Sequence, residues 1–194
     1  MKIFKSVFTV VAVATCTFIA SQAFARPPVY FKSPIQFRGT GCPGPNSVTV
    51  SGANTDTMTV MFDQYDAAKP KNNAASKMMR TSCSFVVPVK VPNGFQVSHV
   101  TSDWRGFAEG KTKLHREYFI AGKRGLSVDD FPKGDYTLRD NLEHATWASS
   151  CNGGVFPMRI NSSVRAMSQP SYIAVDTVDL KNKIVFQVKW RRCP

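Results

Sequence analysis

The sequence predicts an all-β fold: an antiparallel two-sheet β-sandwich, jelly-roll-like, with two disulfides and little helix. Two observations lead to this prediction. Apolar residues alternate with polar ones in several segments, and the exported part of the chain holds four cysteines. Successive side chains of a strand point to opposite faces, so such alternation gives one dry face and one wetter face. Half-buried strands of this kind suit two antiparallel sheets that pack face to face.

Strong alternation marks four segments of the chain, and each is expected to form a strand. These segments are residues 48–50, 57–62, 84–91 and 184–191. Weaker alternation marks five more candidates, at residues 95–100, 113–121, 136–139, 156–160 and 172–175. Pro88 lies within the third strong segment. Because proline cannot donate to a sheet ladder, we expect that position at an edge or a bulge.

Turn residues separate these segments. Asn93-Gly94 follows Pro92 and predicts a hairpin between the strands on either side of it. Asp140 to Glu143 resembles a capping box, which predicts a turn or two of helix. Further reversals are expected at residues 133–135 and 180–182, and an exposed polar loop at residues 66–77.

The N-terminal segment has the organisation of a secretory signal peptide. Lys2 and Lys5 give it a positive start, and an apolar run of 14 residues follows at 7–20. This run is shorter than the roughly 18 residues that a membrane-spanning helix needs, and Ala23-Phe24-Ala25 supplies a small-x-small cleavage pattern. We therefore expect residues 1–25 to be a signal peptide cleaved near Ala25 and Arg26. Residues 26–194 would form one secreted or periplasmic domain without a transmembrane segment.

The exported chain is strongly basic. Without Lys2 and Lys5 it has 23 basic residues against 13 acidic ones, a net charge of +10. Such a charge favours solubility, and it also favours an anionic partner such as an acidic glycan, a lipopolysaccharide or membrane headgroups. The charge is dispersed, with no block of five or six like charges, so nucleic acid is not an expected partner.

Four cysteines, Cys42, Cys83, Cys151 and Cys193, remain after the loss of Cys16. An even number in an exported chain predicts two disulfides, whereas structural zinc sites need closely spaced ligand pairs, which the chain lacks. Three pairings are compatible with the sequence. We favour Cys42–Cys83 and Cys151–Cys193, because each would brace its own half of the chain. Each closes a loop of about 40 residues, worth roughly 4 kcal/mol.

No catalytic or cofactor-binding motif occurs in the chain. It has no nucleophile elbow, phosphate-binding loop or dinucleotide fingerprint, and paired cysteines leave no thiolate. Asp129 and Asp130 are adjacent, so on a strand they would point to opposite faces rather than across a glycosidase cleft, and we expect them to be solvated loop residues. The sequence therefore favours a protein without enzymatic activity, cofactor or metal. Two weak calcium candidates are Asp63 with Asp66 and Asp176 with Asp179.

Tryptophan residues are the best candidates for ligand recognition, and Trp104 has two interpretations. An exposed ring beside Arg105 would stack on a sugar or hold an anionic group, which makes Asp103, Trp104 and Arg105 a candidate binding surface. Alternatively, the ring packs over the end of a sheet and Arg105 pairs with Asp103. Trp190 continues the apolar face of the last strand and is expected in the core.

Six short motifs occur in order along the mature chain. They are Gly39-Thr40-Gly41-Cys42-Pro43, Arg80-Thr81-Ser82-Cys83, Pro92-Asn93-Gly94-Phe95, Trp104-Arg105-Gly106, Trp147-Ala148-Ser149-Ser150-Cys151 and Trp190-Arg191-Arg192-Cys193. This ordered set resembles a small secreted family, the domain of unknown function 4360, over about residues 30–194. The resemblance implies an exported protein whose four cysteines are architectural, and it implies no catalytic residues.

Three hypotheses about function remain. The favoured one is a non-enzymatic binding module for an anionic or carbohydrate surface, because the chain is exported and basic and contains the Trp104–Arg105 pair. A secreted inhibitor or toxin-like factor acting on a partner protein is an alternative, since rigid disulfide-braced loops reduce the ordering cost of binding. A hydrolase with scattered carboxylates is the third, and it requires acidic residues and a histidine in one pocket.

Overall fold

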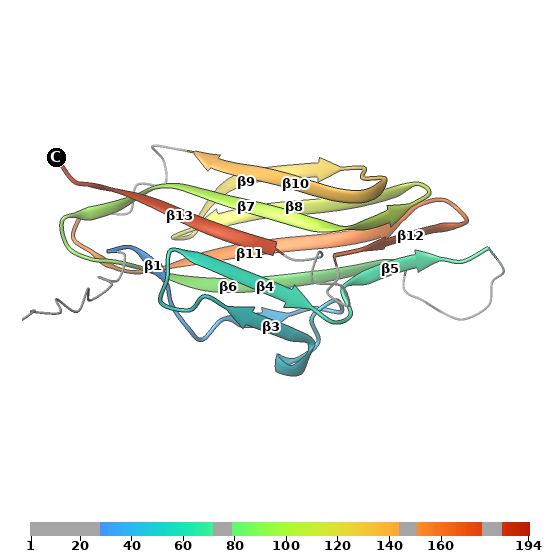
Figure 1. The fold of residues 1–194 in the computed structure, drawn as a ribbon, viewed down its shortest axis with the longest axis horizontal. Coiled ribbons are helices and arrows are strands. Elements are labelled where there is room, and N and C mark those ends of the chain that lie inside the picture. Colours follow the sequence, from blue (N-terminus) through green and yellow to red (C-terminus); the bar gives the residue numbers. More distant parts are fainter. Residues whose placement is uncertain (1–27, 72–78, 144–150, 176–183) are drawn as a thin grey trace, which may run out of the picture.

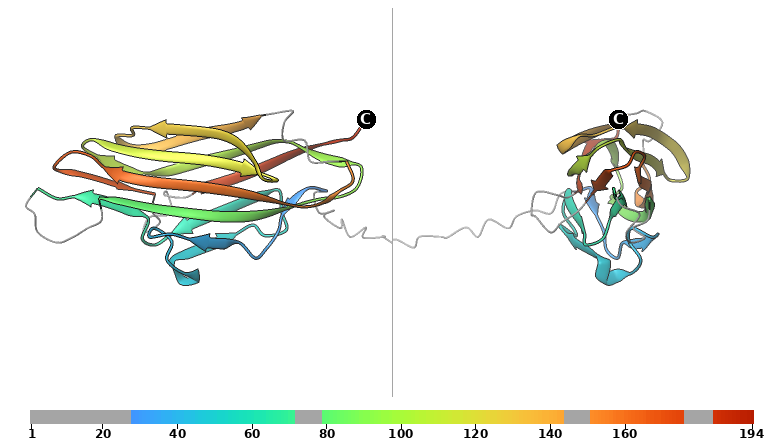
Figure 2. Two further views of the ribbon diagram at one scale, coloured as in Figure 1. Left: turned by 180° about the vertical axis from the view of Figure 1, so that it is seen from behind. Right: turned by 90° about the vertical axis from the view of Figure 1, so that its right-hand side faces the viewer.

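The computed structural model describes residues 28–71, 79–143, 151–175 and 184–194, so the predicted signal peptide lies outside the described residues. Two sheets run along the long axis of the molecule (Figure 1, Figure 2). The first sheet contains β1 (Tyr30–Phe31), β2 (Gln36–Arg38), β6 (Arg80–Val91), β8 (Thr112–Ile120), β9 (Lys123–Asp130) and β11 (Gly154–Ala166). The second contains β3 (Val48–Ser51), β4 (Thr57–Phe62), β5 (Asp66–Lys69), β7 (Phe95–Glu109), β10 (Gly134–Glu143), β12 (Ser171–Ala174) and β13 (Ile184–Arg192).

Both sheets are antiparallel. Over the described residues, the first sheet has the order β1-β6-β11-β8-β9 with β2 also paired to β6, and the second has the order β3-β4-β13-β7-β12-β5 with β10 also paired to β7. Each predicted strand segment falls on an observed strand to within one residue, and the helical content of the described ranges is the 3-10 turn η1 (Pro45–Ser47). The predicted all-β, two-sheet sandwich with two disulfides is confirmed.

The core lies between the sheets and is built from the inward positions of alternating strands. In β6, every second residue from Thr81 to Val91 is buried. Phe85 of this strand meets Phe186 of β13, at 5.9 Å between ring centroids, and Phe62 of β4, at 6.2 Å, across the gap. Burial of one such ring is worth about 1.5–3 kcal/mol, so these contacts stabilise the packing of one layer on the other.

The turn at Asn93-Gly94 connects the two sheets, so the predicted hairpin is wrong. It follows β6 of the first sheet and precedes β7 of the second. Gly94 has a positive φ of 78°, as the turn chemistry requires. However, its N–H donates to the carbonyl of Cys151 (3.0 Å), and its carbonyl accepts from the N–H of Cys193 (2.9 Å). The local turn is as expected, whereas distant segments set the partner strand.

Two other local predictions are also wrong because strand pairing overrides them. Asp140 and Glu143, expected in a helical turn, belong to β10, which pairs with β7 along its whole length. The segment 66–69, expected in a polar loop, forms β5 and pairs with β12. The remainder of that predicted loop beyond Lys71, up to residue 77, lies outside the described residues, as does the predicted reversal at 180–182.

Pro88 lies in the interior strand β6, so its predicted place at an edge or a bulge is wrong. β6 pairs with β11 on one side and with β1 and β2 on the other. The Pro88 carbonyl accepts a hydrogen bond from Lys32 (2.7 Å), which shows that the backbone of Pro88 faces the β1 side. In an antiparallel strand the nitrogen of a residue points the same way as its carbonyl. The missing N–H therefore falls in the gap between β1 and β2, where no ladder partner needs it.

Each disulfide joins the pair that the sequence favours. Cys42 and Cys83 are bonded at 2.01 Å and are both buried. Cys151 and Cys193 are bonded at 2.02 Å at the end of the sandwich, where the Gly94 turn contacts both residues. The second disulfide therefore joins the two segments that hydrogen-bond to the turn between the sheets.

Candidate functional site

The expected surface of Asp103, Trp104 and Arg105 does not form as a unit, because strand alternation separates its members. Trp104 points into the core and is 0% exposed. Its neighbours in β7, Asp103 and Arg105, point to the outer face of the second sheet. Asp103 accepts two hydrogen bonds from Arg139, at 2.6 and 2.8 Å, which lower the pKa of Asp103. The hypothesis of an exposed Trp104 ring is therefore wrong, and Asp103 pairs with Arg139 and not with Arg105.

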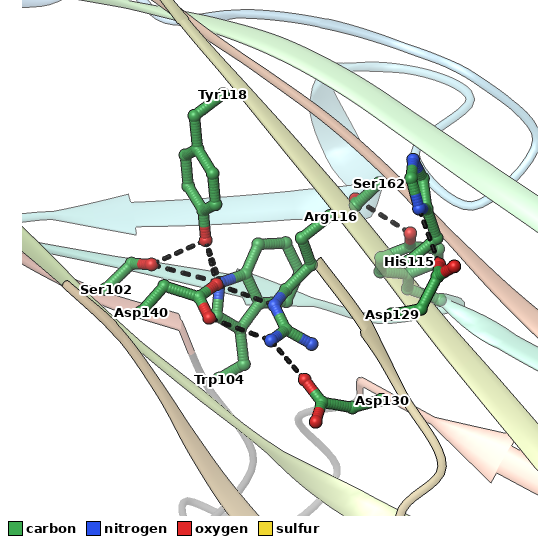
Figure 3. A network of polar contacts seen from close by, with 10 residues as sticks. Ser102, Trp104, His115, Arg116, Tyr118, Asp129, Asp130, Asp140 and Ser162 are labelled. Atoms are coloured by element: carbon green, nitrogen blue, oxygen red, sulfur yellow. Dashed lines mark hydrogen bonds and ion pairs between the residues drawn. The ribbon is translucent and has the colours of Figure 1, made fainter. Parts of the chain in front are cut away.

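Trp104 instead belongs to a buried polar network between the sheets (Figure 3). Its indole Nε1 donates to Tyr118 Oη at 2.7 Å and to Ser102 Oγ at 3.2 Å. The guanidinium of Arg116 lies 5.7 Å from the centre of the Trp104 ring and donates to Asp140 at 2.6 and 2.8 Å. Arg116 and Tyr118 come from β8 of the first sheet. The other members come from the second sheet, Ser102 and Trp104 from β7 and Asp140 from β10, so the network joins the two sheets.

The network keeps a charged pair inside the protein. Arg116 is 1% exposed and Asp140 is 4% exposed. Burial alone would lower the pKa of Arg116, but the hydrogen bond and negative charge of Asp140 raise it above its usual value. Burial raises the pKa of Tyr118, and Asp140 raises it further, so Tyr118 remains a neutral donor. Because these groups are shielded from solvent, they hold the sheets together and do not form a surface for a ligand.

The outer face of the first sheet, on the side away from the core, offers the accessible site. Arg165 of β11 lies directly opposite Arg80 of β6 and directly opposite Lys113 of β8. We call these three residues the cation row. Opposed residues in antiparallel strands share a face, with Cβ atoms about 4.5–5.5 Å apart, and like charges in this position are destabilising. The row therefore places three positive charges side by side on an exposed sheet.

Acidic residues compensate this charge only in part. Lys113 Nζ lies 2.8 Å from Asp129, and the hydrogen bonds of Asp129 to Lys113 and His115 lower its pKa. Asp129 and Asp130, expected in a solvated loop, lie instead in β9 and point to opposite faces. Asp129 faces the outer surface, whereas Asp130 faces inward and pairs with Arg116.

A polar hollow of about 320 Å³ lies beside the cation row on the same face. Hydroxyl and amide groups dominate its lining, and Ser84 Oγ donates to Asn161 Oδ1 at 2.7 Å. Such groups both donate and accept hydrogen bonds, as sugar hydroxyls and anionic oxygens require. The residues that line it are Arg38, Arg80, Ser82, Cys83, Ser84, His115, Glu117, Asn161, Ser162 and Ser163.

His115 and Asp129 form a pair that bears on the hydrolase hypothesis. His115 Nδ1 lies 2.7 Å from Asp129 Oδ1, and Ser163 lies opposite His115 in the sheet register. Among the hydrogen bonds of the described residues, none joins His115 to Ser163, whose hydroxyl instead accepts from Arg80 at 3.5 Å. A serine nucleophile needs a base within hydrogen-bond reach. This arrangement therefore lacks the contact that would activate the hydroxyl.

The remaining sequence candidates give no site. Trp190, expected in the core, is 39% exposed and packs edge-on against Phe95 at 5.3 Å. Within the described ranges, no three histidine, cysteine or acidic residues gather closely enough to hold a metal ion. Asp176 and Asp179 lie outside these ranges. The described residues also contain no helix with the length and apolarity needed to cross a bilayer.

Sequence reasoning missed the cation row because the register between strands was unknown. Alternation alone places Arg159, Asn161, Ser163 and Arg165 on one face of β11, and this pattern is visible in the sequence. The positions opposite Arg165 come from strands that lie far away along the chain. Only the pairing of β11 with β6 and β8 brings the three charges together.

Comparisons with known proteins find a matching family and a secreted relative. A sequence profile of the family described as Domain of unknown function (DUF4360) matches residues 33–193. An "Uncharacterized secreted protein" of Arthroderma benhamiae is 28% identical over 172 residues, which cover 82% of this chain and 70% of that protein.

Two solved structures show weak likeness. TmCBM61 in complex with β-1,4-galactotriose aligns with a TM-score of 0.37 and 13% identity, over 83% of this chain and 90% of that one. The GH31 α-xylosidase from Xanthomonas citri aligns with a TM-score of 0.24 and 10% identity, over 84% of this chain and 19% of that one. At these TM-scores neither structure bears on function.

Proposed function

The chain belongs to the DUF4360 family and is a secreted or periplasmic protein, and from this premise we propose that it is a non-enzymatic module that binds an anionic glycan. The cation row of Arg80, Arg165 and Lys113 carries the proposal. Like charges directly opposite one another destabilise a sheet. A row of three is therefore best explained by an anionic ligand that neutralises it.

The chemistry of the row fits an acidic polymer. Arginine presents a planar fork of donors that matches carboxylate and sulfate groups in a bidentate manner. Neighbouring strands lie about 4.7–4.9 Å apart, so the three charges extend over about 10 Å across the sheet. The polar hollow next to the row supplies neutral hydrogen-bonding groups for the sugar hydroxyls between the charges.

This face as a whole is basic. Cations at the outward positions of its strands outnumber the acidic residues Glu117 and Asp129. Much of the net charge of +10 expected for the exported chain therefore lies on this face of the first sheet. The outward cations are Arg38, Arg80, Lys90, Lys113, Arg124, Arg159 and Arg165.

Retention on heparin tests the proposal. Arg165→Gln removes the central charge of the row, so we expect this variant to elute at clearly lower salt than the wild type. Lys189→Gln is the matched control, because it removes the same charge from an exposed position of β13 in the second sheet. Binding should weaken as salt rises, since screening weakens exposed charge contacts.

The proposal makes a local claim, and the control separates it from an effect of net charge. Equal shifts in the elution of Arg165→Gln and Lys189→Gln would show that net charge alone retains the protein. Equal elution from heparin and from a neutral matrix would show that no anionic ligand is preferred. Either result would overturn the proposal.

A further inference from the structure

A second and larger hollow, of about 900 Å³, lies at one end of the sandwich. The β7–β8 turn forms one side of it, and the segment between β9 and β10 forms the other. In Figure 1 both connections lie at the end of the molecule far from the marked C-terminus. A volume of 300–1,000 Å³ is typical of ligand pockets. We call this hollow the end pocket.

Hydrogen bonds hold both walls of the end pocket in place. Lys111 N–H donates to Ser168 Oγ at 2.9 Å, which fixes the β7–β8 turn. The buried Thr112 donates from Oγ1 to the carbonyl of Pro132 at 3.1 Å, which fixes the segment between β9 and β10. Gly110 and Gly134 have φ values of 71° and 65°, so each wall bends at a position that favours glycine. The pocket is therefore formed before any ligand binds.

Aromatic rings and ammonium groups line the end pocket together. Phe107 is 37% exposed and Phe131 is 58% exposed, although large aromatic side chains are usually buried. Lys111 and Lys133 supply positive charge, and Glu109 supplies one carboxylate that can accept hydrogen bonds. Phenyl rings pack against the apolar face of a sugar ring, while ammonium groups pair with an anionic substituent.

The end pocket and the cation row are neighbours along β8. Lys111 and Thr112 line the pocket, and the next residue, Lys113, belongs to the row. We infer that the end pocket holds an acidic sugar ring of the same polymer that the cation row binds. This inference rests on the proposed function and adds a place where one ring of the polymer is recognised by shape as well as by charge.

Calorimetric titration with a short oligogalacturonate, a chain of uronic acid rings, tests the inference. Phe131→Ala should weaken binding about 3- to 10-fold, the loss expected for one aromatic contact. Phe131→Trp keeps a ring in the pocket, so it should retain the affinity and change its fluorescence when the oligomer binds. Trp190→Ala removes an exposed ring of β13, which packs against Phe95 at the opposite end of β7 from the pocket, and should leave the affinity unchanged. The methyl-esterified oligomer, which has the same rings without charge, should bind more weakly.

The outcomes separate this inference from the proposed function. Unchanged affinity of Phe131→Ala, together with weaker binding of Arg165→Gln, would overturn the inference and leave the proposed function standing. Equal affinity for the charged and esterified oligomers would show that the pocket takes a neutral ring, and would also overturn the inference. If neither oligomer binds to a protein that heparin still retains, the inference is likewise overturned. If heparin retains neither the wild type nor its variants, the proposed function itself fails.

Discussion

Arg116 shows how a single residue links the two sheets. Its guanidinium is buried, contacts Asp140 and Asp130, and lies over the ring of Trp104. A buried ion pair is costly to desolvate, so its net contribution to stability is small while both partners are present. Removal of Asp140 is different, because the buried guanidinium then keeps only the partly exposed Asp130 as its counter-charge, and the other buried donors of the network lose their acceptor.

We therefore expect Asp140→Ala to lower the free energy of unfolding by about 3–5 kcal/mol. Guanidinium chloride unfolding, followed by tryptophan fluorescence, measures this change. Asp103→Ala is the matched control: it also breaks an aspartate–arginine pair, but Arg139 is exposed, so a much smaller loss is expected. The double variant Arg116→Met with Asp140→Leu should recover part of the loss. A loss for Asp140→Ala no larger than that of Asp103→Ala would contradict this account.

Residue-scale predictions from the sequence were right where regular strand alternation decided them and wrong where composition did. Trp190 is the exception, because the register of β13 shifts between Lys189 and Trp190 and the alternation does not continue through this irregularity. The polar neighbours of Trp104 suggested exposure, but its even spacing from the buried residues Val100 and Ser102 places it on the inner face of β7. Alternation also correctly separates Asp129 from Asp130. The burial of Arg116 has no signal in the sequence, because its partners Asp140 and Asp130 come from other strands.

At the scale of the strands, the cation row has a cost that can be measured. Arg165 stands directly opposite two other cations, and such repulsion is worth roughly 0.2–1 kcal/mol. Arg165→Gln should therefore raise the free energy of unfolding at low salt while it weakens binding to heparin. If Arg165 served only to stabilise the fold, its replacement would lower the free energy of unfolding instead.

Urea unfolding at low and at high salt checks this prediction. The gain in the free energy of unfolding of Arg165→Gln should be smaller at about 1 M salt, where the screening length falls to about 3 Å. A variant that is less stable than the wild type at both salt concentrations would show that Arg165 has a structural role in β11.

Most of the strands were predictable, whereas their partners were not. The strands without a predicted counterpart are β1, β2, β5 and β9. Period-two alternation locates every predicted strand, because each strand has one face in the core. The Asn93-Gly94 turn and the capping box at Asp140 are local patterns, and they failed where a distant strand supplied the hydrogen bonds. The cation row depends on the register between distant strands, so it could not be predicted from local sequence patterns either.

At the scale of the whole molecule, the two disulfides differ in their exposure. Cys42 and Cys83 are buried, whereas Cys151 is exposed at the end of the sandwich. Thiol–disulfide exchange requires access to a sulfur atom. Mild reduction should therefore open Cys151–Cys193 first.

Brief treatment with dithiothreitol, alkylation and peptide mass spectrometry measures the order of reduction. Cys151 and Cys193 should carry the label before Cys42 and Cys83. Labelling of the buried pair first, or of all four cysteines at the same rate, would show that the whole sandwich opens before either bond is reduced.

The assignment of ligand binding to one face of the sandwich is tested most directly by nuclear magnetic resonance. A heparin-derived oligosaccharide is titrated into the isotope-labelled protein, and the shifts of backbone amides are followed. We expect the largest changes in β6, β8 and β11 around Arg80, Lys113 and Arg165, with little change in β4 and β13 of the second sheet. Shifts spread evenly over both sheets, or confined to the second, would contradict the account.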